Sequence, residues 1–360
     1  MAEAFSSAYD IVIIGGGPAG ATFAREAAQL LPDKRILLVN GQSDSHRKVC
    51  GGLLAPDAQQ MFARFDLTLP KSVLADPQIF DVKTIDLAKK RVRHYQRHYL
   101  NMDRFAFDNW LLSLVPASVD RLDARCLAVD KSDGGFAVTL LTDAGEQTVC
   151  ADYLVGADGA SSVVRRTLFA RQLSRYVAVQ QHFRCANDAL PPYSCIFDPA
   201  TSDSCSWTIC KDDRVIFGGA FPKQGCRAAF EQQKQHLEAF LGFSLGEPLF
   251  TEACQLGSPR RWRDFVTGEN GAFLLGEAAG FISASSFEGI SSAVLSGRLL
   301  AEAFADGAHA SVVAKGYRRR TRKLRLKLYL KTFKRRLLCS PFCRAMIMKS
   351  GLQSIKKYDA

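Results

Sequence analysis

The feature that most constrains this chain is a glycine-rich turn between a strand-like and a helix-like segment near its start. Residues 9–14 (YDIVII) form a short apolar run rich in β-branched side chains, residues 15–20 read GGGPAG, and residues 21–31 are compatible with a helix. A second apolar run at residues 35–40 completes the pattern of a βαβ unit. Because the G-x-G-x-x-G turn has this full context, it predicts a Rossmann-like dinucleotide-binding fold.

Each position of this turn has a physical role in holding a pyrophosphate. Gly15 allows the tight turn, Gly17 lets the backbone approach the phosphates, and Gly20 lets the helix pack closely on the strand. Pro18 and Ala19 complete the turn at the start of the helix. The free N–H groups there carry a partial positive charge, so we expect them to bind the phosphates.

Asn40 ends the second apolar run, where the fingerprint usually has Asp or Glu to bind the adenosine ribose. An amide accepts a hydrogen bond without charge, so we expect weaker ribose binding there. Two segments far downstream, residues 153–166 and 272–293, also read as strand, glycine turn and helix. A helix beginning near Gly289 would point its N–H groups at whatever lies in front of it and stabilise an anion there by about 1 kcal/mol.

Three strand-turn-helix segments in this order resemble the flavoprotein oxidoreductases typified by p-hydroxybenzoate hydroxylase, whose FAD domain is assembled from separated segments. The resemblance implies non-covalent FAD, with the acidic residue at position 277 contacting the ribityl chain. The family usually has Asp there, so the longer Glu277 requires either a retreat of the backbone or a contact through water. Beyond the first turn, the cofactor-binding residues implied by the resemblance are Arg104, Asp158, Gly159, Gly276, Glu277, Gly289 and Ile290. For Arg104, a solvated arginine at a helix start is the open alternative.

Residues 48–53 (KVCGGL) are similar to the K-x-C-G-G element of the geranylgeranyl reductase branch, which reduces isolated double bonds of prenyl chains. The chain as a whole resembles more closely the bacterial flavoproteins named for colicin M resistance. The stretches that carry this resemblance are residues 50–59, 193–198, 276–286 and 321–328. The implied activity is the reduction of a polyprenyl-type lipid.

Cys50 is the candidate catalytic residue of that element. The resemblance implies that it lies beside the isoalloxazine ring, together with Lys48, Gly51 and Gly52. A thiol next to Lys48 and Arg47 is a candidate proton donor to the carbon left after hydride transfer. A small polarizable side chain packed against the ring is the alternative, and both readings stay open at this point.

A substrate sheet is predicted between the flavin segments. Its antiparallel strands are expected in the aromatic and β-branched runs at residues 176–180, 193–197, 206–209 and 215–221. Strand alternation makes Trp207, Phe217 and Phe221 candidate walls of a substrate cavity, with ordinary core packing as the alternative. Reductases of the branch usually carry a Y-x-W-x-F-P element, of which residues 205–210 keep only the tryptophan, so the cavity shape is not carried over.

These segments predict an α/β fold with three parts. An FAD-binding domain would extend to residue 310 in segments of about 1–65, 100–170 and 265–310. It would be interleaved with an α+β substrate domain at about 66–99 and 171–264. Residues 311–360 would form a basic helical C-terminal extension.

The net charge of +11 belongs to this extension, since residues 311–360 hold 16 of the 47 Lys and Arg but one of the 36 acidic residues. An amphipathic basic helix is expected at residues 317–338. Its apolar stripe would be Leu326, Leu330, Phe333 and Leu337, beside a basic stripe of Lys323, Lys327, Lys331 and Lys334. We expect it to bind an anionic membrane surface, and packing of the apolar stripe on the body is the alternative. Nucleic acid is not expected, because no nucleic-acid-binding fold accompanies the charge.

Composition excludes several classes of protein. A chain that is 47% hydrophobic is too apolar to be disordered, and no apolar run is long enough to cross a bilayer. The first residues lack the pattern of an export signal, so we expect a cytoplasmic protein, peripheral on the inner face of the cytoplasmic membrane. The eleven Cys and six His do not have the spacing of a metal site, and no metal is expected.

The predicted function is that of an FAD-dependent oxidoreductase that reduces a carbon-carbon double bond of a prenyl or other lipid-like substrate. No second nucleotide-binding βαβ unit is visible, so electrons are expected from transiently bound NAD(P)H, with another electron donor as the open alternative. Two alternatives stay open: an FAD-dependent monooxygenase, and a non-catalytic flavin-bearing lipid-binding or maturation protein.

Overall fold

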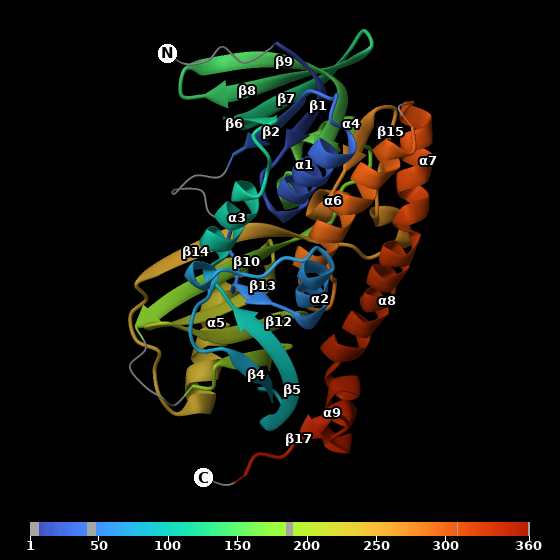
Figure 1. Ribbon diagram of the computed structural model, residues 1–360. Helices are drawn as coiled ribbons and strands as arrows, with labels where there is room; N and C mark the ends of the chain where they lie inside the picture. Colours follow the sequence, from blue (N-terminus) through green and yellow to red (C-terminus); the bar gives the residue numbers. More distant parts are fainter. Residues whose placement is uncertain (1–6, 42–47, 185–189, 308, 359–360) are drawn as a thin grey trace.

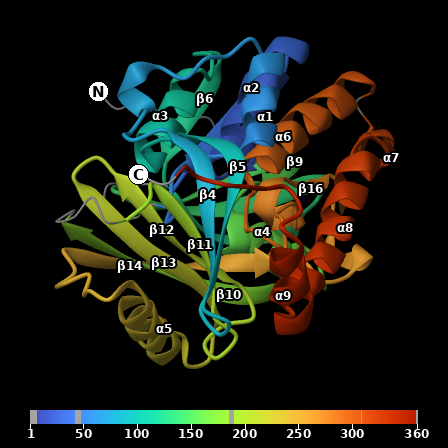
Figure 2. The same ribbon diagram turned by 90° about the horizontal axis from the view of Figure 1, so that it is seen from below.

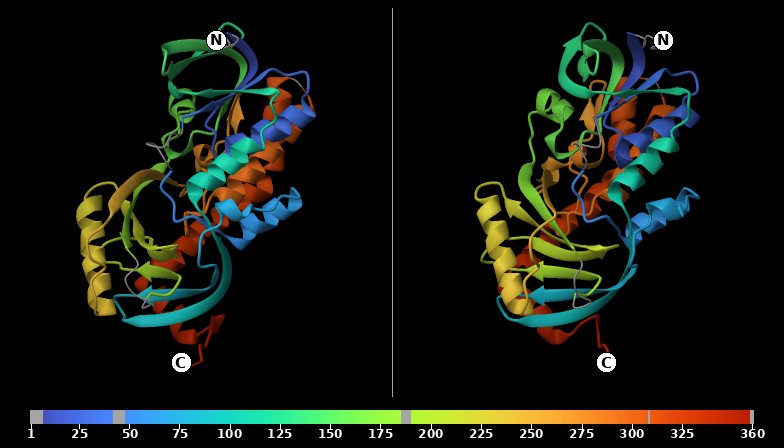
Figure 3. Two further views of the ribbon diagram at one scale, coloured as in Figure 1. Left: turned by 60° about the vertical axis from the view of Figure 1, so that its left-hand side comes forward. Right: turned by 90° about the vertical axis from the view of Figure 1, so that its left-hand side faces the viewer.

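The computed structural model describes residues 7–41, 48–184, 190–307 and 309–358. Two sheets organise the chain, one at the top and one at the bottom of Figure 1, and the C-terminal helices run down one side past both of them. Two views from other sides show the same separation between the sheets (Figure 3).

The first sheet has the Rossmann-like core. Its strand order is β15-β16-β9-β1-β2-β6, and β8 pairs with both β7 and β9. The strands are β1 (Ala8–Ile14), β2 (Ile36–Asn40), β6 (Val119–Asp123), β7 (Arg125–Ser132), β8 (Gly135–Thr142), β9 (Gly145–Gly156), β15 (Gly268–Glu269) and β16 (Ala272–Leu274). The run from β16 to β6 is parallel. Its central strands are apolar along their length because parallel strands are covered on both faces.

Helices α1 (Pro18–Leu30) and α6 (Ile290–Ala305) pack against each other beside this sheet. Gly297 makes their close approach possible, because a Cβ there would lie 2.8 Å from the carbonyl oxygen of Ala19. The other helical segments of this part of the chain are α2 (Pro56–Arg64), α3 (Arg104–Ser113), α4 (Val163–Leu168) and the short 3-10 turns η1 (Lys71–Val73), η2 (Gly159–Ser161), η3 (Trp262–Asp264) and η4 (Gly276–Ala279).

The second sheet has the order β14-β10-β13-β12-β11-β4-β5-β17, with β3 pairing to β5. Its strands are β3 (Leu53–Leu54), β4 (Ile79–Asp86), β5 (Arg91–Asn101), β10 (Ser174–Arg184), β11 (Tyr193–Phe197), β12 (Cys205–Lys211), β13 (Arg214–Pro222), β14 (Phe250–Ser258) and β17 (Ser354–Ile355). All neighbours are antiparallel except β11 and β4. Helix α5 (Cys226–Leu241) lies against this sheet, away from the C-terminal helices (Figure 2). The fold class predicted from the sequence is thus confirmed, including the interleaving of the two sheets along the chain.

The C-terminal extension contains α7 (Ala310–Arg320), α8 (Arg322–Cys339) and α9 (Pro341–Ser350). The prediction of one helix over residues 317–338 is wrong at its start, because the chain changes helix at Thr321. Tyr317 is fully buried and its hydroxyl donates to the carbonyl of Leu274, 3.0 Å away, which holds the end of α7 on the first sheet. Thr321 Oγ1 donates to the carbonyl of Tyr317 at 2.8 Å, and α8 leaves from this anchored turn.

Candidate active site

The three glycine turns predicted from the sequence lie together. Gly15 has φ of 111°, and a Cβ there would lie 2.5 Å from the carbonyl oxygen of Ala157, directly before the second turn. A Cβ on Gly276, in the third turn, would lie 3.0 Å from the Cβ of Ala19. Gly20 closes the first turn, since a Cβ there would meet the carbonyl of Gly15. Backbone contacts of this kind are possible only with glycine, so the turns are built around one another.

The N-terminus of α1 is open as a phosphate site requires. Gly17 precedes the helix, no side chain caps its N–H groups, and Pro18 takes the first helical position. Among the described residues, nothing would lie within 4 Å of a Cβ on Gly17. A phosphate can therefore approach the free N–H groups of this turn.

Asp158 supplies a second feature that fits a bound FAD. Its Oδ2 accepts from the backbone N–H of Val163 at 2.6 Å and so caps α4, whereas its Oδ1 is buried without a hydrogen-bond partner among the described residues. Burial raises the pKa of this carboxyl group, and the hydrogen bonds to Oδ2 oppose that only in part. An orphaned buried oxygen needs a donor, and a hydroxyl of the cofactor would be one. The described residues thus fit FAD.

Asn40 lies at the end of β2, beside the first turn. A Cβ on Gly16 would be 2.7 Å from its Oδ1, and its Nδ2 donates to Asp123 at 3.3 Å. The amide is therefore beside the turn that is predicted to hold the pyrophosphate, as the ribose assignment requires.

Glu277 is bonded to the protein through both carboxylate oxygens. Oε2 lies 3.1 Å from Lys48 Nζ, and Oε1 accepts from the N–H of Gly257 on β14 at 2.7 Å. Burial lowers the pKa of Lys48, but the Glu277 carboxylate more than offsets this and the pKa is raised. Gly159 belongs to the same cluster, since a Cβ there would lie 3.9 Å from Glu277 Oε2. Because Glu277 is one methylene longer than the Asp usual in the family, its carboxylate reaches Gly257 of the second sheet.

Cys50 lies close enough to Arg104, the first residue of α3, for their side chains to interact electrostatically. Asp103 caps this helix by accepting from the N–H of Ala106 at 2.8 Å, and Arg104 Nε donates to Asp108 at 2.9 Å. The charge of Arg104 also interacts with Cys50, whose Sγ accepts from the backbone N–H of Gly52 at 3.4 Å. Burial lowers the pKa of Arg104, but Asp108 and Cys50 raise it by more than burial lowers it. The net pKa is therefore raised and the guanidinium stays charged. The predicted second cation beside Cys50, Arg47, lies outside the described residues.

Lys211 is a buried cation next to Gly52, and the sequence analysis did not predict it. Its Nζ donates to Asn101 Oδ1 at 2.8 Å and to the carbonyl of Met102. It also lies 2.5 Å from where a Cβ on Gly52 would be, and Gly52 has φ of 65°, so this position requires glycine. Burial lowers the pKa of Lys211 to about 8, with Cys50 as the first group that acts in the other direction. Lys211 stands directly before a β-turn, where lysine is ordinarily solvated, and nothing in the local sequence signals its burial.

Of the three predicted cavity aromatics, only Trp207 lies near these residues. Its Nε1 donates to Gln180 Oε1 at 3.1 Å and would be 3.8 Å from a Cβ on Gly51. Phe217 and Phe221 are instead fully buried beneath α5, with ring centroids 5.1 and 5.8 Å from that of Phe230. Their assignment as cavity walls is wrong.

The reason lies in the register of β12 and β13. Trp207 pairs with Gly218, and strand alternation puts Gly218 and Phe217 on opposite faces of the sheet. Because Gly218 has no side chain, the indole ring of Trp207 fits above it. Core packing, the alternative that the sequence left open, therefore holds for both phenylalanines.

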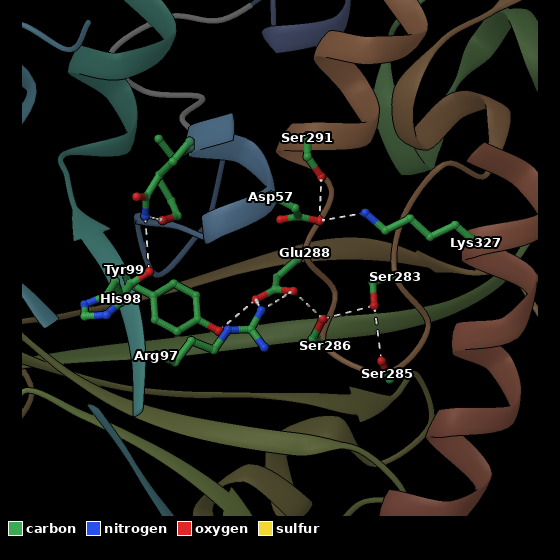
Figure 4. Close-up of polar contacts among 12 residues, drawn as sticks. Asp57, Arg97, His98, Tyr99, Ser283, Ser285, Ser286, Glu288, Ser291 and Lys327 are labelled. Carbon is green, nitrogen blue, oxygen red and sulfur yellow. Dashed lines mark hydrogen bonds and ion pairs between the residues drawn. The ribbon is translucent and has the colours of Figure 1, made fainter. Parts of the chain in front are cut away.

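The start of α6 carries a polar network that the sequence did not predict (Figure 4). Gly289 caps the helix without a side-chain hydrogen bond, and Ile290 is its first residue. Directly before them, Glu288 accepts from Tyr99 Oη at 2.9 Å, Arg97 Nη2 at 3.1 Å and Ser286 Oγ at 2.9 Å. Burial, followed by the Glu288 charge, raises the pKa of Tyr99. This loop is therefore held by β5, far away in the sequence.

A second part of Figure 4 joins α8 to the same region. Asp57 Oδ2 accepts from Ser291 Oγ at 3.2 Å and lies 3.3 Å from Lys327 Nζ. Nearby is a pocket of about 250 Å³ between the 283–288 loop, the end of β14 and α8. Its lining residues are Asp203, Pro259, Arg260, Ala284, Thr332, Arg335, Arg336 and Cys339. Three arginines against one aspartate make it cationic.

Comparison with known proteins identifies the family. Protein CbrA from Escherichia coli O6:H1 (strain CFT073) is 46% identical over 353 residues, which cover 96% of this chain and 94% of that protein. The chain belongs to the CbrA family. Protein CbrA from Shigella sonnei (strain Ss046) is also 46% identical over 353 residues, covering 96% of this chain and 98% of CbrA. The relationship to the flavoproteins named for colicin M resistance, predicted from the sequence, is confirmed.

Other comparisons show the fold of this CbrA relative. The family model described as pyridine nucleotide-disulphide oxidoreductase matches residues 9–183. A geranylgeranyl bacteriochlorophyll reductase-like protein of Thermoplasma acidophilum superposes with a TM-score of 0.77 at 17% identity, over 94% of this chain and 90% of that one. The p-nitrophenol 4-monooxygenase PnpA of Pseudomonas putida DLL-E4 gives 0.72 at 15% identity, over 96% and 93%. The fold is that of the FAD-dependent oxidoreductases.

Proposed function

We propose that the protein reduces a carbon-carbon double bond of a prenyl or other lipid-like substrate, using FAD. The observation that carries the proposal is the ion pair of Lys48 with Glu277 at 3.1 Å, two residues from Cys50, whose thiol interacts electrostatically with Arg104. These contacts bring the K-x-C-G-G element together with α3 and the third glycine turn. The reductase-like element is thus at the predicted cofactor site.

Reduction of an alkene requires a hydride at one carbon and a proton at the other. Bound FAD, once reduced, would supply the hydride, and we propose NAD(P)H as its transient reductant. Cys50 would supply the proton: its S–H bond breaks, the new C–H bond forms, and the thiolate takes up a proton from solvent afterwards. The charges of Arg104 and Lys211 interact with Cys50, and they would stabilise the thiolate while it lasts.

The resemblance to reductases of prenyl chains supports this substrate class over a small polar one. The geranylgeranyl bacteriochlorophyll reductase-like neighbour has the same fold, although its identity of 17% carries the fold alone. The cationic pocket beside Ala284 would suit a substrate with an anionic group near its reactive part.

The activity is tested without air. Protein loaded with FAD and reduced with dithionite is mixed anaerobically with geranylgeraniol or its diphosphate, and flavin reoxidation is followed by absorbance. We expect reoxidation and a product that has gained two hydrogen atoms by mass spectrometry. Turnover that needs oxygen and inserts an oxygen atom would mean a monooxygenase, and no reoxidation by either prenyl compound would contradict the reductase proposal.

Cys50→Ala tests the proton donor. We expect FAD binding to be retained and single-turnover reoxidation to slow by about 100-fold, as for loss of a general acid, with partial recovery in Cys50→Ser. Cys150→Ala is the control, since Cys150 is exposed on β9. Equal rates in Cys50→Ala and the unmodified protein would assign Cys50 to packing alone.

A further inference from the structure

The predicted apolar stripe of α8 points away from the body of the protein. Its four side chains are 45–57% exposed. Helix α9 continues the stripe with three more large apolar side chains that are 37–76% exposed. We call these seven residues the outer apolar face: Leu326, Leu330, Phe333, Leu337, Phe342, Met346 and Ile347. Clustered exposed apolar side chains of this kind usually mark an interaction site.

The orientation of α8 is set by its opposite side. Leu324 and Leu328 are buried in the same hydrophobic core as the first sheet, and Thr332 is buried farther along α8. Lys327 pairs with Asp57, and Arg335 pairs with Asp203 at 2.6 Å. The outer apolar face therefore cannot turn inward without breaking these contacts.

Helix α9 is anchored as firmly. The Arg344 guanidinium lies 2.8 Å from the carboxylate of Asp86, with both groups almost completely buried. Arg93 Nε donates to the carbonyl of Met348 at 2.8 Å. Both helices thus present the face from a fixed position.

The charged side chains of α8 and α9 themselves have one sign. Exposed basic side chains flank the outer apolar face at Arg322, Lys323, Lys334, Arg336 and Lys349. Residues 311–358 contain no Asp or Glu. A partner surface must therefore be apolar within and anionic at its boundary.

We propose that the outer apolar face docks on an anionic lipid bilayer and holds the protein there as a peripheral membrane protein. An interfacial helix inserts apolar side chains below the headgroups while its Lys and Arg stay among the anionic phosphates, which is the pattern of α8. Each basic residue near the surface contributes about 1 kcal/mol, so the five together suffice for reversible attachment. No helix among the described residues has the length and apolar character to cross a bilayer.

Docking would also place the cationic pocket near the bilayer. Thr332, Arg335 and Arg336 of α8 line that pocket, and a helix with its side chains is about 10 Å across. If the proposed function holds, a lipid substrate would have a short path from the bilayer to this pocket. The docking itself does not depend on the proposed function.

The test is sedimentation with vesicles of phosphatidylcholine alone or mixed with phosphatidylglycerol, at low and high salt, without substrate. We expect binding to the phosphatidylglycerol vesicles at low salt. Replacing Leu326, Leu330 and Leu337 together by Gln should weaken it at least about 10-fold. A matched control, Phe80→Gln with Leu249→Gln, changes exposed apolar residues on the second sheet's side and should leave binding unchanged.

Equal binding to neutral vesicles, or unchanged binding of the triple variant, would overturn the proposal. So would a third outcome, in which the protein does not bind vesicles and the triple variant abolishes a dimer seen by light scattering. The last would assign the face to a second copy of the chain. Because flavin reoxidation is measured in a separate experiment without vesicles, failure of docking and failure of the reductase activity are distinguishable.

Discussion

Lys48 Nζ lies 3.1 Å from Glu277 Oε2, although 229 residues separate the two in the chain. Glu277 also accepts from the N–H of Gly257 on β14, so one carboxylate joins the K-x-C-G-G element, the third glycine turn and the second sheet. Both side chains are mostly buried. The pair is therefore a structural tie as well as part of the predicted cofactor site.

Removing this tie should destabilise the protein. We expect Lys48→Met and Glu277→Gln each to lower the free energy of unfolding, and the double variant to lose less than their sum, with a coupling of about 1 kcal/mol. Urea denaturation of the four proteins measures it. The more exposed pair of Lys34 and Asp10 is the control and should couple more weakly. Strict additivity at positions 48 and 277 would contradict the ion pair.

Gly17→Ala should separate cofactor binding from folding. Nothing described lies within 4 Å of the added methyl group, and the backbone there, with φ of −68°, suits alanine. Without FAD, the variant should melt at the same temperature as the unmodified protein. It should bind FAD at least about 10-fold more weakly, because the methyl group would occupy the space through which a phosphate reaches the turn. Flavin fluorescence titration measures the affinity.

Gly20→Ala is the matched variant for that experiment. Its methyl would lie 1.9 Å from the carbonyl oxygen of Gly15, so it should fail to fold or melt far lower. If Gly17→Ala binds FAD normally, the first turn is not the pyrophosphate site.

Lys211 should give the stability of the protein a specific pH dependence. Burial lowers its pKa to about 8 from 10.5. Below pH 8 the Lys211 ammonium of the folded protein is a buried charge. Between pH 8 and pH 10.5 the unfolded chain keeps the Lys211 proton while the folded protein has lost it. The free energy of unfolding should therefore rise with pH in this window, by about 2 kcal/mol from pH 7 to 9.5.

Lys211→Met isolates that contribution from other groups that titrate in the same range. The difference in unfolding free energy between the unmodified protein and Lys211→Met should change with pH across this window. A difference that is constant from pH 7 to 9.5 would show that Lys211 titrates normally.

The buried pair of Arg344 and Asp86 should be essential for the position of α9. Arg344→Met leaves the Asp86 carboxylate buried without its partner, so we expect a loss of about 3 kcal/mol in unfolding free energy. Adding Asp86→Asn should recover part of that loss, because the unpaired charge is gone. Arg336→Met, at an exposed position of α8, is the control. Equal stability of Arg344→Met and this control would contradict the anchor.

Much of the fold could be predicted from local patterns. A strand followed by a glycine turn and a helix restricts the backbone over a few residues, so β1, α1 and β2 were placed to within a few positions. The spacing of Leu326, Leu330, Phe333 and Leu337 likewise identified a helical stripe correctly. What the stripe faces could not be predicted, because that depends on which residues of the rest of the chain lie against α8.

The sequence by itself determined the three glycine turns, their order and the family, because each turn needs particular residues at neighbouring positions. Only the tertiary structure decided that Phe217 and Phe221 pack beneath α5, that Lys211 is buried beside Cys50, and that Glu288 is held by Tyr99. Those contacts join residues far apart in the chain. They follow from the register of paired strands and the packing of side chains between sheets, which no local run of residues specifies.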